Sequence, residues 1–154
     1  MDTTGNSFTG SYSYTLDTKG RVNIPSKMRR ALGPTNDGTF VATRSGDLCI
    51  VLYPIQVWKD KLEDKLLRLN KGSALNRHFA RNLLRHAETL QYDSQGRVAL
   101  PAGLVKFAQI EKEVEIVGMI DRIEIWSPGR LAEIEARFAD HEEELEAIAR
   151  EIDL

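Results

Sequence analysis

One short pattern occurs twice in this sequence, and it limits the chain to folds with two related halves. The segment LDTKGRVNIP covers residues 16–25, and YDSQGRVALP covers residues 92–101. The aspartate, the glycine, the arginine, the first valine and the proline recur at a constant separation of 76 positions. In a chain of 154 residues, such a repeat occupies equivalent places in the two halves. We therefore expect two copies of one structural unit.

Each copy is expected to begin with a β-hairpin. Residues 11–16 alternate between polar and apolar side chains, which is the pattern of a half-buried strand. Aspartate and glycine at the first and fourth positions of DTKG and DSQG favour a type I turn, in which glycine supplies a positive φ. Beyond the turn the alternation resumes, with the arginine on the face opposite the apolar residues. Pro25 and Pro101 are suited to the start of a helix, and Gly33 to the end of the first one.

A second hairpin and a further helix complete each copy. TFVAT and LCIVLY form the predicted hairpin of the first half, and VEIVGM and IEIWS that of the second. Pro54 and Pro128 then precede helical patterns. Each unit exposes more apolar strand than it can cover alone, so the halves are expected to cover one another. The predicted fold is α+β, a pseudo-twofold β-barrel made by one chain, with flanking helices.

The pattern predicts five segments. Residues 1–9 are a disordered extension, 10–55 the first domain, 56–89 a helical connector, 90–130 the second domain and 131–154 an acidic C-terminal helix. Apolar residues of this last helix follow a heptad repeat, in which His141 is the one polar residue of the seam. We expect the helix to pack on its own chain or on a neighbouring one, with equal weight.

The charge distribution is compatible with a polyanionic partner. Residues 131–154 carry 9 acidic and 2 basic side chains, whereas the other 130 residues carry 14 acidic and 19 basic ones. A basic body with an acidic tail is compatible with nucleic-acid binding. The sequence contains no apolar run that could cross a bilayer and no secretory signal, so no membrane partner is expected. The single cysteine, Cys49, excludes an intrachain disulfide and fits a cytoplasmic protein.

No catalytic or metal-binding pattern stands out. Two copies of Asp-Thr or Asp-Ser resemble the paired acids of aspartic proteases, but Lys19 and Gln95 occupy the places where those sites need glycine. His78 and His86 are eight residues apart with no thiol or carboxylate at ligand spacing, and His141 is remote from both. Cys49 falls in an apolar strand. We therefore expect no enzymatic activity, no metal and no cofactor.

The repeated turn suits DNA binding. An arginine near the tip of a two-stranded ribbon can donate two hydrogen bonds to guanine O6 and N7 in the major groove. Arg21 and Arg97 are the candidates for this contact. The basic residues Lys19, Lys27, Arg29 and Arg30 are expected around the first tip as phosphate contacts, and Lys106 beside the second. An equally weighted interpretation is that Asp17–Arg21 and Asp93–Arg97 are ion pairs that stabilise the turns by about 0–1 kcal/mol.

The two motifs and their surroundings resemble the MraZ family of bacterial transcriptional regulators, which carry two tandem AbrB-like domains. The resemblance rests on GSYSYTLDTKGRVNIPSKMRRAL, LYPIQVWKDKLEDKL and YDSQGRVALPAGLVKFAQIEKEVEIVGMIDRIEIWSP, and extends from about residue 10 to residue 128. It implies an AbrB-type swapped-hairpin, double-split β-barrel, a pseudo-dimer within one chain.

The resemblance also implies a function. It suggests a ring-forming homo-oligomer that binds short G-rich direct repeats in double-stranded promoter DNA, usually repressing the division and cell-wall gene cluster. Such a protein is cytoplasmic and associated with the nucleoid. Arg21 and Arg97 match the arginines that reach DNA, whereas Asp17 and Asp93, with Gly20 and Gly96, match the positions that orient them. The alternative is an AbrB-like protein-interaction or antitoxin-like module without specific operator binding.

Overall fold

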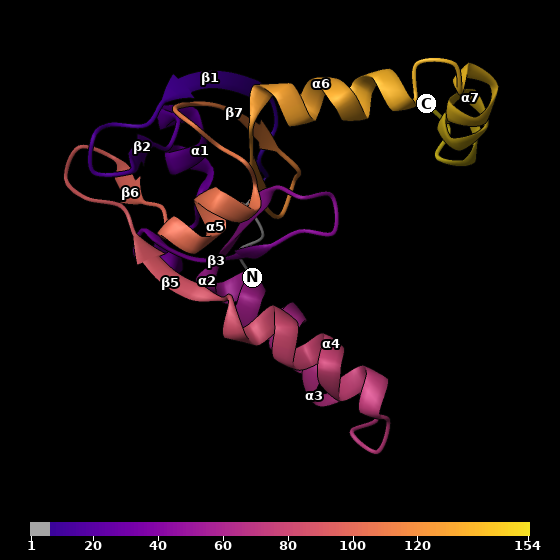
Figure 1. Cartoon of the computed structure of the whole chain (residues 1–154), viewed down its shortest axis with the longest axis horizontal. Helices are drawn as coiled ribbons and strands as arrows, with labels where there is room; N and C mark the ends of the chain where they lie inside the picture. The colour runs from indigo at the N-terminus through magenta and orange to yellow at the C-terminus, as the bar shows by residue number, and fades with distance from the viewer. Residues whose placement is uncertain (1–6) are drawn as a thin grey trace.

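The computed structural model describes residues 7–154, which form a mixed α+β fold (Figure 1). One antiparallel sheet has six strands in the order β1-β7-β8-β4-β3-β5, and a second sheet pairs β2 with β6. The strands are β1 (Ser11–Thr15), β2 (Arg21–Asn23), β3 (Thr39–Arg44), β4 (Ile50–Pro54), β5 (Glu88–Gln91), β6 (Arg97–Ala99), β7 (Glu113–Gly118) and β8 (Ile123–Trp126).

The sheet order is symmetric between the two repeats. Exchanging β1 with β5, β3 with β7 and β4 with β8 gives the same order read from the other edge of the sheet. In the two-stranded sheet, the equivalent residues Val22 and Val98 are directly opposite one another. A pseudo-twofold axis therefore relates the halves, as the repeat predicts.

Strand pairing at the two motif turns differs from the prediction. After one backbone hydrogen bond, from Asp17 N–H to Arg21 O (2.9 Å), β1 and β2 separate. β1 pairs with β7 of the other half, β5 pairs with β3, and β2 pairs with β6. The strand pairing predicted for the hairpins at DTKG and DSQG is therefore wrong. The strands find their partners across the axis because each half alone cannot cover its apolar face.

The second hairpin of each half is confirmed. β3 pairs with β4, and β7 pairs with β8, in antiparallel register. β1 and β5 are the outer strands of the six-stranded sheet, so among residues 7–154 hydrogen bonding does not close this sheet into a barrel.

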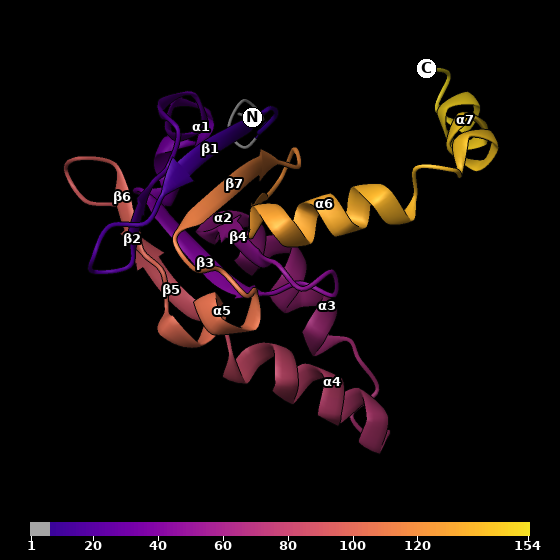
Figure 2. The same ribbon diagram turned by 45° about the horizontal axis from the view of Figure 1, so that its top comes forward.

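Short helices flank the sheets (Figures 1 and 2). Pro25 and Pro101 directly precede α1 and α5, and Pro54 precedes α2, in agreement with the expected helix starts. The helical segments are α1 (Ser26–Ala31), η1 (Pro34–Asn36), α2 (Ile55–Val57), the π-helical turn η2 (Trp58–Glu63), α3 (Asp64–Leu67), α4 (Ala74–Arg85), α5 (Ala102–Phe107), α6 (Pro128–Arg137) and α7 (Glu142–Glu151).

The expected single C-terminal helix is wrong, because the chain bends between α6 and α7. Residues 138–141 form the bend, where the Phe138 and His141 rings meet edge to face with centroids 5.4 Å apart. Three glutamates follow in the first turn of α7. Carboxylates stabilise a helix N-terminus through its dipole, so this sequence favours a new helix start. Figures 1 and 2 show α7 held away from the sheets at the end of α6.

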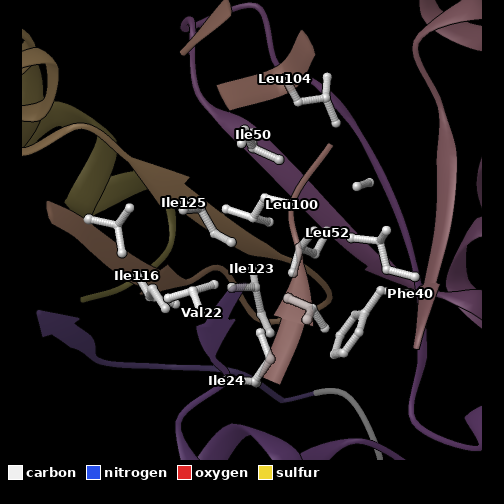
Figure 3. Close-up of a cluster of buried hydrophobic side chains, with 14 of the residues drawn as sticks. Val22, Ile24, Phe40, Ile50, Leu52, Leu100, Leu104, Ile116, Ile123 and Ile125 are labelled. Carbon is white, nitrogen blue, oxygen red and sulfur yellow. The ribbon is translucent and has the colours of Figure 1, made fainter. Parts of the chain in front are cut away.

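The main core contains side chains from both repeats (Figure 3). Val22 and Val98 reach into it from the two-stranded sheet. The labelled members of the cluster are Val22, Ile24, Phe40, Ile50, Leu52, Leu100, Leu104, Ile116, Ile123 and Ile125. Because the core is formed jointly by the two repeats, neither repeat can bury its apolar residues independently.

Part of the predicted extension, residues 1–9, belongs to the folded core. Residues 1–6 lie outside the described part of the chain. Phe8, however, is 1% exposed and exchanges two backbone hydrogen bonds with Ile120, of 2.8 and 2.7 Å. Phe8 thus belongs to the core. The expectation that residues 1–9 are disordered is therefore wrong at Phe8.

Candidate nucleic-acid interface

The first motif turn is held by its aspartate. Gly20 N–H donates to Asp17 O at 3.0 Å, and Gly20 has a φ of +76°, which favours glycine. Asp17 Oδ1 accepts hydrogen bonds from the backbone N–H groups of Lys19 and Arg21, both at 2.9 Å. Its other oxygen, Oδ2, accepts from Arg21 Nε at 2.7 Å. The carboxylate therefore fixes both the turn and the arginine side chain.

The second turn repeats the same network. Asp93 Oδ1 accepts from the backbone N–H groups of Gln95 and Arg97 at 2.9 Å, and Oδ2 accepts from Arg97 Nε at 3.0 Å. Gly96 N–H closes the turn on Asp93 O at 2.9 Å. The sequence repeat is therefore matched by a repeated hydrogen-bond pattern, which includes both expected ion pairs.

These hydrogen bonds shift the titration of both aspartates. The Arg21 backbone N–H is the main cause that lowers the pKa of Asp17, and the Arg97 backbone N–H acts in the same way on the pKa of Asp93. Hydrogen bonds to the charged form of a carboxyl group stabilise that form. Both aspartates are therefore ionised at neutral pH, and each keeps its arginine oriented.

The arginines are partly exposed. The side chains of Arg21 and Arg97 are 30% and 24% exposed. Within residues 7–154, their hydrogen bonds to side chains use only Nε. The terminal nitrogens are left for other acceptors, although Arg97 Nη1 also lies 3.9 Å from Asp17 Oδ2. This geometry combines the two interpretations of the motif, since the ion pair orients a group that still has donors to offer.

The two turns are tied to each other through the β2–β6 ribbon. Leu100 N–H donates to Gly20 O at 3.0 Å, and Ile24 N–H donates to Gly96 O at 2.8 Å. Asn23 Nδ2 adds a bond to Gln95 O at 3.1 Å. Each turn glycine thus accepts from the strand end of the other repeat. The spacing of the two arginines is set by this ribbon and not by a flexible linker.

The neighbours of each turn also come from the opposite repeat, which corrects the expected grouping. Arg29 donates from Nε to Ile24 O at 3.0 Å and lies against Gly96 of the second turn, where a Cβ atom would come within 2.6 Å of Arg29 Cζ. Lys106, expected beside the second turn, lines a groove with Lys19 and Gly20 of the first. The exchange of strands carries α1 and α5 across the axis, which a linear sequence does not reveal.

The remaining candidate cations are accessible. Lys19 is exposed in the first turn, and Lys27 and Arg30 are exposed on α1. Arg29 is half-buried, and its Nε donates to Ile24 O of the first motif. The sequence did not indicate the role of Asn23, which bonds to Gln95 O of the other turn. Its only signal is its place between two apolar residues, two positions after Arg21.

The environments of Cys49 and His86 do not indicate a reactive or metal-binding site. Cys49 is fully buried, and burial raises the pKa of its thiol to about 12. Burial, together with Arg44 and Arg85, lowers the pKa of His86. In residues 7–154, no three His, Cys, Asp or Glu side chains form a group that could hold a metal ion. Across the same range, the helices are too short or too polar to span a bilayer.

Comparisons with known proteins agree with the repeat. A family model described as "MraZ protein, putative antitoxin-like" matches residues 7–82 and again residues 83–153. Transcriptional regulator MraZ of Halothermothrix orenii is 42% identical over 123 residues, which cover 80% of this chain and 82% of that protein. The protein of the same name from Pediococcus pentosaceus is 38% identical over 142 residues, covering 90% of this chain and 96% of that protein.

Proposed function

The chain belongs to the MraZ family of transcriptional regulators, a family without enzymatic activity, and from this premise we propose that it binds double-stranded promoter DNA through Arg21 and Arg97. The observation that carries the proposal is the duplicated network in which an aspartate holds Nε of each arginine. The terminal nitrogens, which donate to no side chain within residues 7–154, then remain as a pair of donors. Such a pair matches O6 and N7 of guanine in the major groove.

Preorganisation is the advantage of this arrangement. A free arginine loses rotamer freedom when it binds, whereas one already held at Nε loses less. The ribbon that ties Gly20 to Leu100 and Gly96 to Ile24 also fixes where the two guanidinium groups lie relative to each other. Two arginines of one chain thus meet two positions of the operator in a defined register.

Surrounding cations supply the phosphate contacts in this proposal. Lys19, Lys27 and Arg30 are exposed, and Lys106 shares a groove with Lys19. Arg29 adds positive charge beside Gly96 of the second turn, while its Nε donates to Ile24 O. Phosphate contacts add affinity that depends on salt and not on sequence, whereas base contacts provide discrimination.

The proposal extends to operator, assembly and fold type. The operator is a set of short G-rich direct repeats upstream of the division and cell-wall gene cluster, which the protein represses in the cytoplasm while associated with the nucleoid. Direct repeats suit a homo-oligomeric ring with head-to-tail contacts, because such a ring presents several copies in the same direction. Linked copies also gain effective concentration after the first contact. The exchanged pairing of β1 with β7 and of β5 with β3 supports a swapped-hairpin, double-split barrel.

Titration of fluorescent promoter DNA tests the proposal. Fragments upstream of the chain's own gene are compared with scrambled DNA of equal length and composition. Arg21→Ala and Arg97→Ala should each reduce discrimination by about 1–3 kcal/mol, or roughly 5- to 150-fold. Arg68→Ala is the matched control, because Arg68 also pairs with an aspartate four residues away (3.1 Å) but lies on the C-terminal side of α3. Equal loss on matched and scrambled DNA would reduce both arginines to phosphate contacts.

A second candidate follows from the words "antitoxin-like" in the family description. In that case the exposed turns contact a protein, and the promoter fragments give no titration even at low salt. Retention of DNA discrimination by both arginine variants would likewise exclude the base contact that we propose.

A further inference from the structure

The outer face of the β2–β6 ribbon consists of four side chains. The central valines of the two strands are buried and lie opposite each other, so the alternate residues point to the other side of the ribbon. Arg21 is opposite Ala99, and Asn23 is opposite Arg97. Figures 1 and 2 show the two strands side by side, away from α4 and α7. We call these four residues the reading face.

The reading face departs from the pseudo-twofold symmetry at one of its two pairs. Exchange of the repeats places Arg97 where Arg21 stands, and both arginines are held at Nε by an aspartate. The same exchange places Ala99 where Asn23 stands. A face that obeyed the axis fully would read DNA alike in both directions, as a twofold dimer reads a palindrome. The Asn23–Ala99 pair therefore gives the reading face a direction.

Asn23 is oriented by the second turn and keeps a free acceptor. Its Nδ2 donates to Gln95 O at 3.1 Å. Within residues 7–154, its Oδ1 accepts no hydrogen bond, and the side chain is only half-buried. Residues directly opposite in an antiparallel pair have Cβ atoms about 4.5–5.5 Å apart, so the side chains of Asn23 and Arg97 leave the ribbon at neighbouring points.

The second turn is also the better supported of the two. A Cβ atom added to Gly96 would meet Arg29, whereas one added to Gly20 would have only Leu100 O within 4 Å. Val105 occupies the place in α5 that Arg29 occupies in α1, and it lines an open groove beside the first turn. The amide thus lies on the more firmly held side of the reading face.

We propose that Asn23 is a specificity-determining residue, whose Oδ1 accepts a hydrogen bond from adenine or cytosine next to the guanine that Arg97 contacts. This inference rests on the DNA binding of the proposed function and gives that binding an orientation. In the major groove, adenine N6 and cytosine N4 are the only base donors. Ala99 has no polar side-chain atom, so the base next to the other guanine is under no such requirement. Direct repeats need this distinction, because every copy has to bind its repeat in the same orientation.

Sequencing of random double-stranded DNA retained by the full chain tests the inference. The unaltered protein should enrich a motif that differs from its reverse complement, with adenine or cytosine next to one of two guanines. Asn23→Ala should remove that preference and make the two sides of the motif alike, whereas Ala99→Asn should add the preference at the second guanine. In titrations of short duplexes, reversal of the selected base pair should weaken binding of the unaltered protein about 5- to 150-fold, and that of Asn23→Ala less than about 2-fold.

Two further variants separate base reading from support of the turn. Asn23→Asp loses the donor to Gln95 O but keeps an acceptor, so it should keep the preference at lower overall affinity. Asn70→Ala is the matched control, because Asn70 Oδ1 also binds a turn, accepting from Gly72 N–H at 3.0 Å, but lies between α3 and α4. This control should change neither the motif nor the affinity. Circular dichroism verifies the fold of each variant, and if Asn23→Ala does not fold, Ala99→Asn at its exposed position still decides.

The possible results separate this inference from the proposed function. Retention of the preference by Asn23→Ala, its loss in Asn23→Asp, or an unchanged motif in Ala99→Asn would overturn the inference and leave the guanine contacts intact. An equal loss of affinity for all duplexes in Asn23→Ala would reduce the residue to a support of the second turn, which would also overturn it. A failure of the unaltered protein to enrich any motif would overturn the proposed function itself.

Discussion

Alanine at the two turn glycines should have unequal effects, because only one of the two turns is covered by Arg29. Gly20 and Gly96 both have positive φ, at +76° and +80°. A left-handed backbone costs an L-residue about 1–2 kcal/mol, and the stiffer unfolded chain offsets about 0.4–1 kcal/mol of this. Gly20→Ala should therefore lower the free energy of unfolding by about 1 kcal/mol, since the nearest atom to its added Cβ is Leu100 O at 3.8 Å.

Gly96→Ala should cost more. Its Cβ would lie 2.6 Å from both Cζ and Nε of Arg29, so the guanidinium has to move. Movement breaks the bond from Arg29 Nε to Ile24 O, and a typical hydrogen bond contributes about 1 kcal/mol. The flexible arginine can give way, so the total should be about 2 kcal/mol, or a Tm about 4–8 °C lower in a chain of this size.

A double-mutant cycle measures the difference. Urea denaturation of Gly20→Ala, Gly96→Ala, Arg29→Ala and the two combined variants, at one protein concentration, gives each free energy of unfolding. Arg29→Ala should couple to Gly96→Ala by about 1 kcal/mol and add independently to Gly20→Ala. Equal costs at the two glycines, or coupling of Arg29 to Gly20, would refute the exchange of neighbours between the turns.

Three further results are expected. Because the pKa values of Asp17 and Asp93 are lowered in the folded state, their ionisation stabilises the fold above the ordinary aspartate pKa, and this contribution is lost as the pH falls through the folded values. The stability deficit of Asp17→Asn with Asp93→Asn should thus be full at pH 6 and shrink below about pH 4; a deficit that does not change with pH would contradict this. Burial raises the pKa of the Cys49 thiol to about 12, so this thiol should resist a disulfide reagent in the native protein and react with it in urea. Rapid labelling of the native protein would contradict the burial of Cys49. Phe8→Ala should lower the free energy of unfolding by about 3–5 kcal/mol, with the exposed neighbour variant Thr9→Ala near zero; a small effect of Phe8→Ala would remove this residue from the core.

Local features of the fold could be predicted because their causes are local. The period-2 alternation, the Asp-x-x-Gly turns and the prolines before α1, α2 and α5 each act within a few residues. The hairpins β3–β4 and β7–β8 were predictable for the same reason. The bend at residues 138–141 was not, because a heptad repeat continues across it and only the three glutamates that follow signal a new helix.

Which strands pair with each other could not be predicted from the sequence pattern. The alternation in residues 11–16 specifies a strand but not whether it pairs with β2 or with β7. The motif arginines and aspartates were found because they repeat, whereas the placement of Arg29 at the second turn and of Lys106 at the first follows from an exchange that only the three-dimensional arrangement contains. The link from Asn23 to Gln95 has the same origin.

The pairing of β1 with β7 also has a consequence for synthesis on the ribosome. Ser11 is opposite Val117, so 105 residues are translated between the two. At about 5–20 residues per second, the first strand waits roughly 5–20 s for its partner. Ser11 and Ser13, which later donate hydrogen bonds to Glu115, keep one side of that waiting strand hydrophilic. A nascent chain that stalls before residue 113 would leave the hydrogen-bonding edge of β1 unpaired. That edge would then be available to other unfinished chains or to a chaperone.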